Sequence, residues 1–171
     1  MSTPITPCLW FDGTALEAAE FYVSVFSGLS ARPGAPGGSD SRVLAVQYVE
    51  EDHPAGLPAG DVLCVSFELQ GRPYFALNGG PGFPFTYAVS FQTFHETQEE
   101  LDTVWDALVE GGEPMQCSWL VDRYGLHWQV VPEAYREAMH AGGEAADRAH
   151  RALLTMVKPD IAEVERAIAG T

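Results

Sequence analysis

An amide interrupts an otherwise apolar run in residues 119–132, which read WLVDRYGLHWQVVP. Two short apolar segments around the tight DRYG connection predict a β-hairpin. Alternate residues of a strand share a face, so we expect Gln129 and His127 on one side of this strand. Trp128 and Val130 should then pack under a helix on the other. An imidazole on the open side could act as an acid or base near neutral pH, although a partly exposed His near a strand start is the more common interpretation.

The same alternation extends this polar face to other segments. The expected lining combines amides, a hydroxyl and apolar walls: Ala88, Ser90 and Gln92 from residues 88–94, Asn78 at the end of an earlier strand, and Leu9 and Phe11 from the first strand. Val89 and Phe91 are left for the core. Such a cavity suits a neutral or weakly polar small molecule. The alternative is that the amides hydrogen-bond one another or a trapped water and bind nothing.

Other reactive side chains are interpreted as structural. The cysteines are odd in number, widely spaced and set in apolar runs, so they predict reduced core thiols and no disulfide framework. A nucleophilic thiolate needs a neighbouring base, and the sequence places none beside Cys8, Cys64 or Cys117. The remaining histidines are expected on the surface: His53, His95, His140 and His150.

An internal repeat supplies the elements that must position these residues. Residues 14–17 (TALE) form a capping box followed by apolar residues at helical spacing up to Gly28, and residues 97–100 (TQEE) begin the same pattern 83 positions later (97 − 14). Strand-like segments flank both helices, so each half is predicted to be β-α-β-β-β. Two such units are too small to close a core alone and should pack together. The expected strands are residues 5–11, 42–49, 62–69 and 73–78, then 85–94, 112–116, 115–121 and 126–131.

The chain is predicted to have four parts. These are a first module (1–78), a Gly- and Pro-rich linker (79–85), a second module (86–132) and a helical tail (133–171). Within the tail, Asp160 and Glu163 repeat the capping signature. Its apolar helix faces fit two roles, covering the sheet or contacting a second subunit.

Composition narrows the choice of partners. Twenty-four Asp and Glu residues against nine Lys and Arg give a formal charge of −15, which repels phosphate backbones and anionic membranes. We therefore expect neither nucleic acid nor membrane as a partner. The sequence shows no signal-like segment and no apolar run near the roughly 20 residues that cross a bilayer, so a cytoplasmic location is expected.

Several motifs together resemble one family. They are ITPCLWFDGTALEAAEFYVSVF (5–26), ALNGGPGFPF (76–85), SFQTF (90–94) and QCSWLVDRYGLHWQVVP (116–132), with DIAEVERA (160–167) in the tail. They are similar to the PhnB-like branch of the vicinal oxygen chelate superfamily, which holds glyoxalase I, extradiol dioxygenases and bleomycin-resistance proteins. Members of this branch often carry the label 3-demethylubiquinone-9 3-methyltransferase. The resemblance implies an α+β fold, with tandem βαβββ modules forming curved mixed sheets before the C-terminal helical extension, in a homodimer.

The resemblance also implies where a metal would lie. In the metal-dependent enzymes of the superfamily, a residue on the first strand of each module and an acid near its last strand chelate one divalent ion. Aligned on the helix caps and the hairpin turn, these positions fall on Pro7, on Ala88 or Ser90, on Gln129, and on Ala76 or Asn78. None is a usual ligand of a catalytic ion, so neither a metal nor another cofactor is expected.

The predicted function is therefore binding of a small organic ligand in a sheet-lined cavity, without the usual metal, as in bleomycin-resistance proteins. Two alternatives stay open. One is a glyoxalase- or dioxygenase-like enzyme with an unconventional site on Gln129, Gln92 and His127, and the other is a structural or regulatory dimer module. Methyltransferase activity is not expected, because the glycine pairs at 37–38 and 79–80 lack the strand-turn-helix context that binds S-adenosylmethionine.

Overall fold

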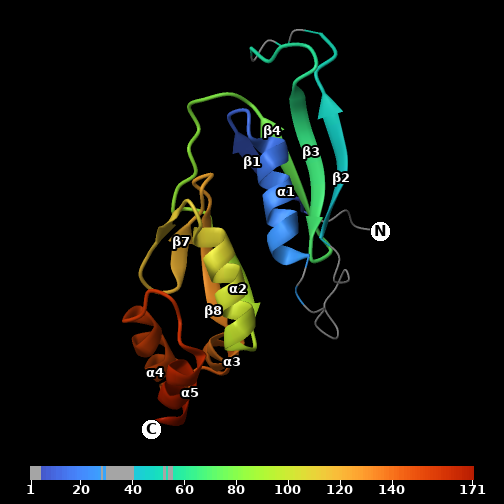
Figure 1. Ribbon diagram of the computed structural model, residues 1–171. Helices are drawn as coiled ribbons and strands as arrows, with labels where there is room; N and C mark the ends of the chain where they lie inside the picture. The colour runs from blue at the N-terminus through green and yellow to red at the C-terminus, as the bar shows by residue number, and fades with distance from the viewer. Residues whose placement is uncertain (1–4, 28, 30–40, 52, 54–55) are drawn as a thin grey trace. The chain divides into compact units, whose positions relative to one another are not determined.

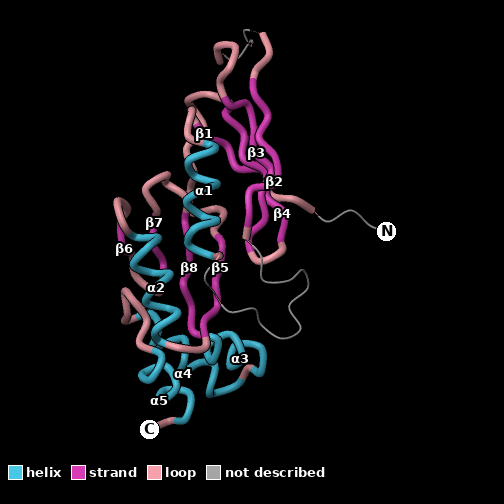
Figure 2. Tube along the Cα trace, turned by 45° about the vertical axis from the view of Figure 1, so that its right-hand side comes forward, coloured by secondary structure: helices cyan, strands magenta, loops and turns pink. Residues whose placement is uncertain are grey.

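The computed structural model describes residues 5–27, 29, 41–51, 53 and 56–171. The elements follow the order β-α-β-β-β twice and end in three helices, so the α+β class, the tandem modules and the helical tail are confirmed (Figures 1 and 2). The chain divides into two compact units, Met1–Pro84 and Phe85–Thr171. Gly28 and most of the expected loop after the first helix lie outside the described residues.

The first unit is a four-stranded sheet with one helix against it (Figure 1). The strand order is β1-β4-β3-β2, in which only the β1–β4 pair is parallel. Its elements are β1 (Cys8–Phe11), α1 (Ala15–Phe26), β2 (Arg42–Tyr48), β3 (Val62–Leu69) and β4 (Arg72–Asn78). Residues in register share a face. The buried face beneath α1 contains Leu9, Ala76 and Val65 in register, and the opposite, open face contains Cys8, Phe75 and Ser66.

The start of α1 is capped from the sheet. Asn78, the last residue of β4, accepts a hydrogen bond from Ala15 N through Oδ1 at 2.9 Å and donates through Nδ2 to Val62 O at 2.9 Å. Thr14 makes no side-chain cap bond within the described part of the chain, so the first expected capping box does not form. A buried amide from a neighbouring strand satisfies the helix start instead.

The second unit repeats this architecture. Its strand order is β5-β8-β7-β6, and only the β5–β8 pair is parallel. Its elements are β5 (Phe91–His95), α2 (Gln98–Val109), β6 (Glu113–Pro114), β7 (Trp119–Val121) and β8 (His127–Pro132). Helix α2 begins at the predicted cap, because the Thr97 hydroxyl accepts a hydrogen bond from Glu100 N at 3.2 Å. Trp128 and Val130 are buried as predicted, but His127 and Val131 on the Gln129 face of β8 are buried too.

The strands of the two halves correspond at a sequence offset that is one residue larger than the offset of the helices. Phe11 and His95 hold the same place in the two sheet registers, so the strands correspond at an offset of 84 (95 − 11). The helices keep the offset of 83 (98 − 15). The connection of residues 12–14 is therefore one residue longer than that of residues 96–97, and Gly13 adopts φ 83° within it. Because strand faces alternate, this extra residue turns β1 over relative to the helix-based alignment.

The tail packs within the second unit (Figure 2). It contains α3 (Glu133–Ala141), α4 (Gly143–Leu154) and α5 (Ile161–Ala169). Helix α5 begins at the predicted cap, where the Asp160 carboxylate accepts from Glu163 N at 2.9 Å. Helix α3 contacts β8 and β5, so the tail covers part of the second sheet. The tail core consists of Leu153, Met156 and Val164, with Cys117, Tyr135, Ala152 and Ile168 packed against it.

A polar clamp holds the loop before α5 on helix α2. Gln98 Oε1 accepts a hydrogen bond from Ile161 N at 2.9 Å. Lys158 Nζ lies 2.8 Å from Asp102 Oδ1 and 3.0 Å from Asp106 Oδ1. Gln98, Asp102 and Asp106 follow one another at intervals of four residues and so share one face of α2.

The clamp makes stability depend on pH at both extremes. Hydrogen bonds from Lys158 and Gln98 lower the pKa of Asp102. The contribution of Asp102 to stability is therefore present above its unfolded pKa of about 3.9. It is lost as pH falls through its lower folded pKa. Burial lowers the pKa of Lys158, but the bonds to Asp102 and Asp106 outweigh it and raise the pKa. The contribution of Lys158 to stability is present below its unfolded pKa of about 10.4 and is lost as pH rises through its higher folded pKa.

Replacing Lys158 with Met is expected to reduce the free energy of unfolding by about 0.5–1 kcal/mol near neutral pH, a small loss because the clamp is partly exposed and screened. Urea unfolding at acidic, neutral and alkaline pH measures this loss, which should shrink toward both extremes. Arg151→Met, at an exposed position of α4, is the control and should show no such profile. A loss of the same size at every pH would contradict the assignment of the clamp.

Candidate functional site

A hydrogen-bonded group of side chains joins the β5 segment to β8 on the open face of the second sheet. The register places Gln92 of β5 beside Gln129 of β8. Gln92 Nε2 donates to Gln129 Oε1 at 3.0 Å, and Gln129 Nε2 donates to Ser90 Oγ at 2.7 Å. We call Gln92, Gln129 and Ser90 the amide row. The structure thus brings three of the predicted site residues together. The bond between the two amides is also what the alternative, a face that binds nothing, predicts.

Aromatic side chains flank the amide row. Trp119 of β7 is the register partner of Gln129 on the side away from β5. The Tyr87 ring centroid lies 4.5 Å from that of His127 and 6.4 Å from that of Trp119. The sequence interpretation missed both aromatics. The hairpin register could have found Trp119, since it lies opposite Gln129, but Tyr87 reaches the face from a turn that strand alternation does not describe.

His127 lies beneath Tyr87. The histidine is 6% exposed, whereas Tyr87 is 64% exposed, so the tyrosine covers the imidazole from the solvent side. His127 Nδ1 has no hydrogen-bond partner among the described residues. The interpretation of His127 as a partly exposed residue is therefore wrong. Leaving a buried polar atom unpaired costs about 1–3 kcal/mol, so a polar group that reached Nδ1 would bind favourably there.

Three residues expected to line the site lie on the covered face of the first sheet. Leu9 and Phe11 are buried beneath α1, and Asn78 caps that helix. For Leu9 and Phe11 the extra residue at Gly13 explains the difference, because it reverses the faces of β1 relative to the helix-based alignment. These side chains belong to the core of the first unit and are not part of the amide row.

The register gives the first-unit counterparts of the amide pair. Cys8 of β1 pairs with Phe75 of β4, in the same relation as Gln92 with Gln129. Cys8 is exposed on this open face, which corrects its expected place in the core. Burial of part of the side chain raises the pKa of the Cys8 thiol above its ordinary value. A protonated thiol and a phenyl ring therefore occupy the two positions.

Two expected burial states are also reversed near β5. Val89 is exposed, because residues 86–89 form a turn before the strand, in which Val89 N donates to Thr86 O at 3.4 Å. His95 is buried at the end of β5, and its Nε2 lies 3.0 Å from Thr93 Oγ1. The strand therefore begins later, and continues one residue further, than its apolar pattern indicates.

Asp122 organises the hairpin that carries the site. Its Oδ1 accepts hydrogen bonds from Tyr124 N at 2.8 Å and Leu126 N at 3.0 Å, and its Oδ2 accepts from Trp128 Nε1 at 2.8 Å. The carboxylate is 2% exposed. A single buried side chain thus ties the DRYG turn to β8, the strand that holds Gln129.

Arg136 of the tail lies at the α3 end of the same face. Its guanidinium carbon is 5.1 Å from the ring centroid of Phe94, which is two residues from Gln92 on β5. Arg136 Nε donates to Glu133 Oε1 at 2.8 Å, and Nη2 bonds the same oxygen. This cation is a further residue that the sequence interpretation missed, because only the packing of α3 on β5 brings it to the sheet.

Neither Cys64 nor Cys117 has the lowered pKa of a nucleophilic thiol. Burial raises the pKa of Cys117, and burial with a smaller effect of Cys8 raises that of Cys64. The Cys64 thiol donates to Gln47 Oε1 at 3.0 Å. Raised pKa values keep these groups protonated at neutral pH, which agrees with the interpretation of packing residues.

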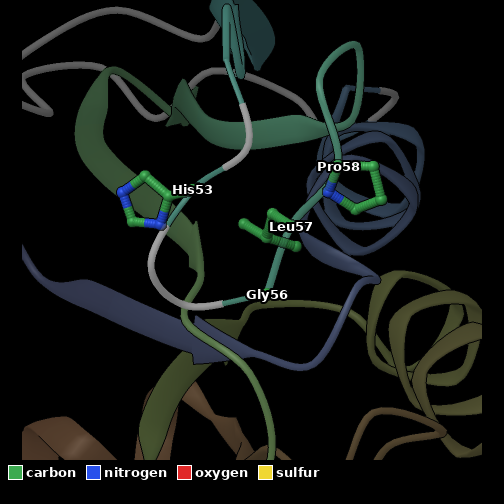
Figure 3. Close-up of a pocket in the computed structure, with 4 residues that line it drawn as sticks. All are labelled: His53, Gly56, Leu57 and Pro58. Atoms are coloured by element: carbon green, nitrogen blue, oxygen red, sulfur yellow. The ribbon is translucent and has the colours of Figure 1, made fainter.

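A surface hollow in the β2–β3 connection is lined by His53, Gly56, Leu57 and Pro58 (Figure 3). His53 N donates to Leu57 O at 2.9 Å, and Gly56 N donates to His53 O at 2.8 Å. Much of its polar backbone is therefore already paired within the loop. We place the candidate site on the second sheet instead.

Two features are absent from the described residues. No group of three or more His, Cys, Asp or Glu side chains in the described part of the chain is arranged to hold a metal ion. Of the helices that the structure describes, none is both long and apolar enough to cross a membrane.

Comparison with known proteins identifies the family. The model of the family described as 3-demethylubiquinone-9 3-methyltransferase matches residues 3–131. The PhnB protein of Bacillus cereus, which carries the same description, is 30% identical over 75% of this chain and 98% of its own, with a TM-score of 0.61. A protein from Pseudomonas aeruginosa is 20% identical over 74% of this chain and 95% of its own, with a TM-score of 0.53, and so shares the fold. No curated protein matches the chain. With most of its length inside the family match and with the tandem βαβββ fold, the chain belongs to this family, the PhnB-like branch of the vicinal oxygen chelate superfamily.

Proposed function

We propose that the open face of the second sheet binds a small organic molecule. The observation that carries the proposal is the amide row, in which three uncharged side chains, Gln92, Gln129 and Ser90, form one hydrogen-bonded chain. Uncharged donors and acceptors beside aromatic walls recognise polar groups of organic ligands without the cost of burying an ion.

The row leaves hydrogen-bonding capacity at both ends. Gln92 donates inward through Nε2, so its Oε1 can accept from a ligand, and no bond to this oxygen is found within the described residues. Ser90 accepts from Gln129, so its O–H can donate. A ligand that carries one donor and one acceptor along a single edge would match this polarity. Tyr87 and Trp119 offer flat apolar surface to the rest of such a molecule.

The donor set does not fit the divalent ion of the superfamily's metal enzymes. Amides carry no charge to balance the ion, and the two glutamines already bond to each other. Their first-unit counterparts, Cys8 and Phe75, offer a protonated thiol and no ligand. We therefore propose binding without the usual metal and without conventional metal-dependent catalysis.

Methyl transfer, which the family description names, is not supported by the fold. Binding of S-adenosylmethionine ordinarily uses a parallel sheet whose first strand leads through a Gly-rich turn into a helix. Each sheet here is mixed, with a single parallel pair. In both units the turn from the first strand to the helix also lacks a Gly-rich sequence: it reads DGT in one and ET in the other. The homodimer that the family resemblance implies stays a prediction.

A thermal-shift screen of metabolites and antibiotics tests the proposal. Compounds that bind the row should raise the melting temperature of the protein. Gln129→Ala should weaken their binding about tenfold, because it removes the central donor and acceptor of the row. Gln116→Ala, which removes an exposed amide outside the row, is the matched control and should keep every shift. A folded Gln129→Ala variant that retains all shifts would exclude the assignment.

A further inference from the structure

The tail brings a side chain to the candidate site from beyond the residues that the family match covers. The family match ends at residue 131, and 75% of this chain accounts for 98% of the Bacillus cereus protein. Helix α3 begins at Glu133 and contacts β8 and β5. Any group that α3 places at the sheet therefore lies beyond the matched residues.

Arg136 is such a group. Ser90, Gln92 and Phe94 alternate along one segment and so share the open face, and the Arg136 guanidinium stacks on Phe94. Residues two apart on a strand are separated by about 6.6 Å, so the ring that Arg136 stacks on is the next side chain after Gln92 along this face.

The arrangement orients the guanidinium and leaves part of it available. Glu133 occupies Nε and Nη2 through one carboxylate oxygen, and the Arg136 Nη1 group bonds to none of the described residues. The Glu133 side chain is 10% exposed and that of Arg136 is 41% exposed, so the carboxylate is held beneath a guanidinium that reaches solvent. An arginine fixed on one edge by a carboxylate can still donate from the other edge to an oxyanion.

We propose that Arg136 makes the site selective for ligands that carry a carboxylate, so that the bound molecule has a planar apolar part near Tyr87 and Trp119 and an anionic end at α3. This inference rests on the proposed function. The net charge of −15 disfavours anions over the whole surface, so a carboxylate would bind only where a fixed cation meets it at hydrogen-bond distance.

The test uses two probes of nearly equal shape, 2-naphthoate and 2-naphthamide, which differ in charge. Heteronuclear NMR of the full chain follows the side-chain amide signals of Gln92 and Gln129 and gives both dissociation constants. Arg136→Gln should weaken naphthoate binding about fivefold and leave naphthamide binding within about twofold, while Arg136→Lys should retain part of the preference.

A second pair of variants separates charge from folding. Glu133→Gln keeps an acceptor for Arg136 but removes the competing negative charge, so naphthoate should bind more tightly while naphthamide is unaffected. Arg123 and Glu110 form a comparable ion pair, at 2.9 Å, away from the amide row. Arg123→Gln and Glu110→Gln are therefore the matched controls and should leave the preference between the probes unchanged.

The outcomes distinguish this inference from the proposed function. If both probes shift the amide-row signals but Arg136→Gln leaves their ratio unchanged, the row binds ligands and the role of Arg136 is overturned. If the control pair changes the ratio as much as the Arg136 and Glu133 variants do, the effect is one of net charge and the inference also fails. If neither probe moves the signals of Gln92 and Gln129, both the inference and the proposed function are contradicted.

Discussion

Replacing Asp122 with Ala is expected to lower the free energy of unfolding by about 4 kcal/mol. The substitution removes a buried carboxylate that accepts from two turn amides and from the Trp128 indole. Hydrogen bonds to a charged acceptor contribute about 1.5–3 kcal/mol each, and the buried donors left behind would be unsatisfied. Because β8 carries Gln129, the variant should also lose ligand-induced thermal shifts in proportion to its loss of structure.

Urea unfolding near neutral pH measures the effect. Asp122→Asn should lie between the wild type and Asp122→Ala, because it keeps the shape but turns one acceptor into a donor that faces an N–H group. Asp147→Ala, at an exposed position of α4, is the control and should change stability by no more than about 0.5 kcal/mol. A loss below about 1 kcal/mol for Asp122→Ala would show that the turn does not depend on this carboxylate.

Gly112→Ala is the second substitution with a large expected effect. A Cβ atom at residue 112 would lie 2.0 Å from Val121 O and 2.9 Å from the Asp122 Cα atom. Both neighbours are backbone atoms of the hairpin that holds the site, so the clash can be relieved only by displacing the main chain. We expect a loss of about 3 kcal/mol in the free energy of unfolding.

The adjacent glycine provides a matched comparison. Gly111 has φ 76°, and a Cβ there would meet Arg123 Cβ at 3.4 Å, which is ordinary contact. Gly111→Ala should therefore lose only the cost of a left-handed conformation, about 1–2 kcal/mol. Chemical denaturation of both variants measures the two losses in the free energy of unfolding. Equal losses would mean that the close approach at residue 112 is relieved without cost.

The fold was accessible from the sequence because its signals are local and occur twice. The Thr97 and Asp160 caps satisfy amides three residues away, which sequence spacing alone describes. The alternation along β8 was also readable, since Trp128 and Val130 are apolar where Gln129 is polar. In β1 the corresponding residues are apolar on both faces, so alternation could not show that Gly13 shifts the strand by one position.

For the candidate site, too, local sequence pattern predicted some features and tertiary packing decided the others. The sequence by itself determined the family and the βαβββ repeat, and it placed Gln92, Gln129 and Ser90 on one face, because strand parity depends only on neighbouring residues. Only the tertiary structure decided that Tyr87 covers His127 and that Arg136 stacks on Phe94. Those contacts join a turn to a hairpin and a tail helix to a sheet. No periodicity encodes such pairs, since they depend on how separate elements pack.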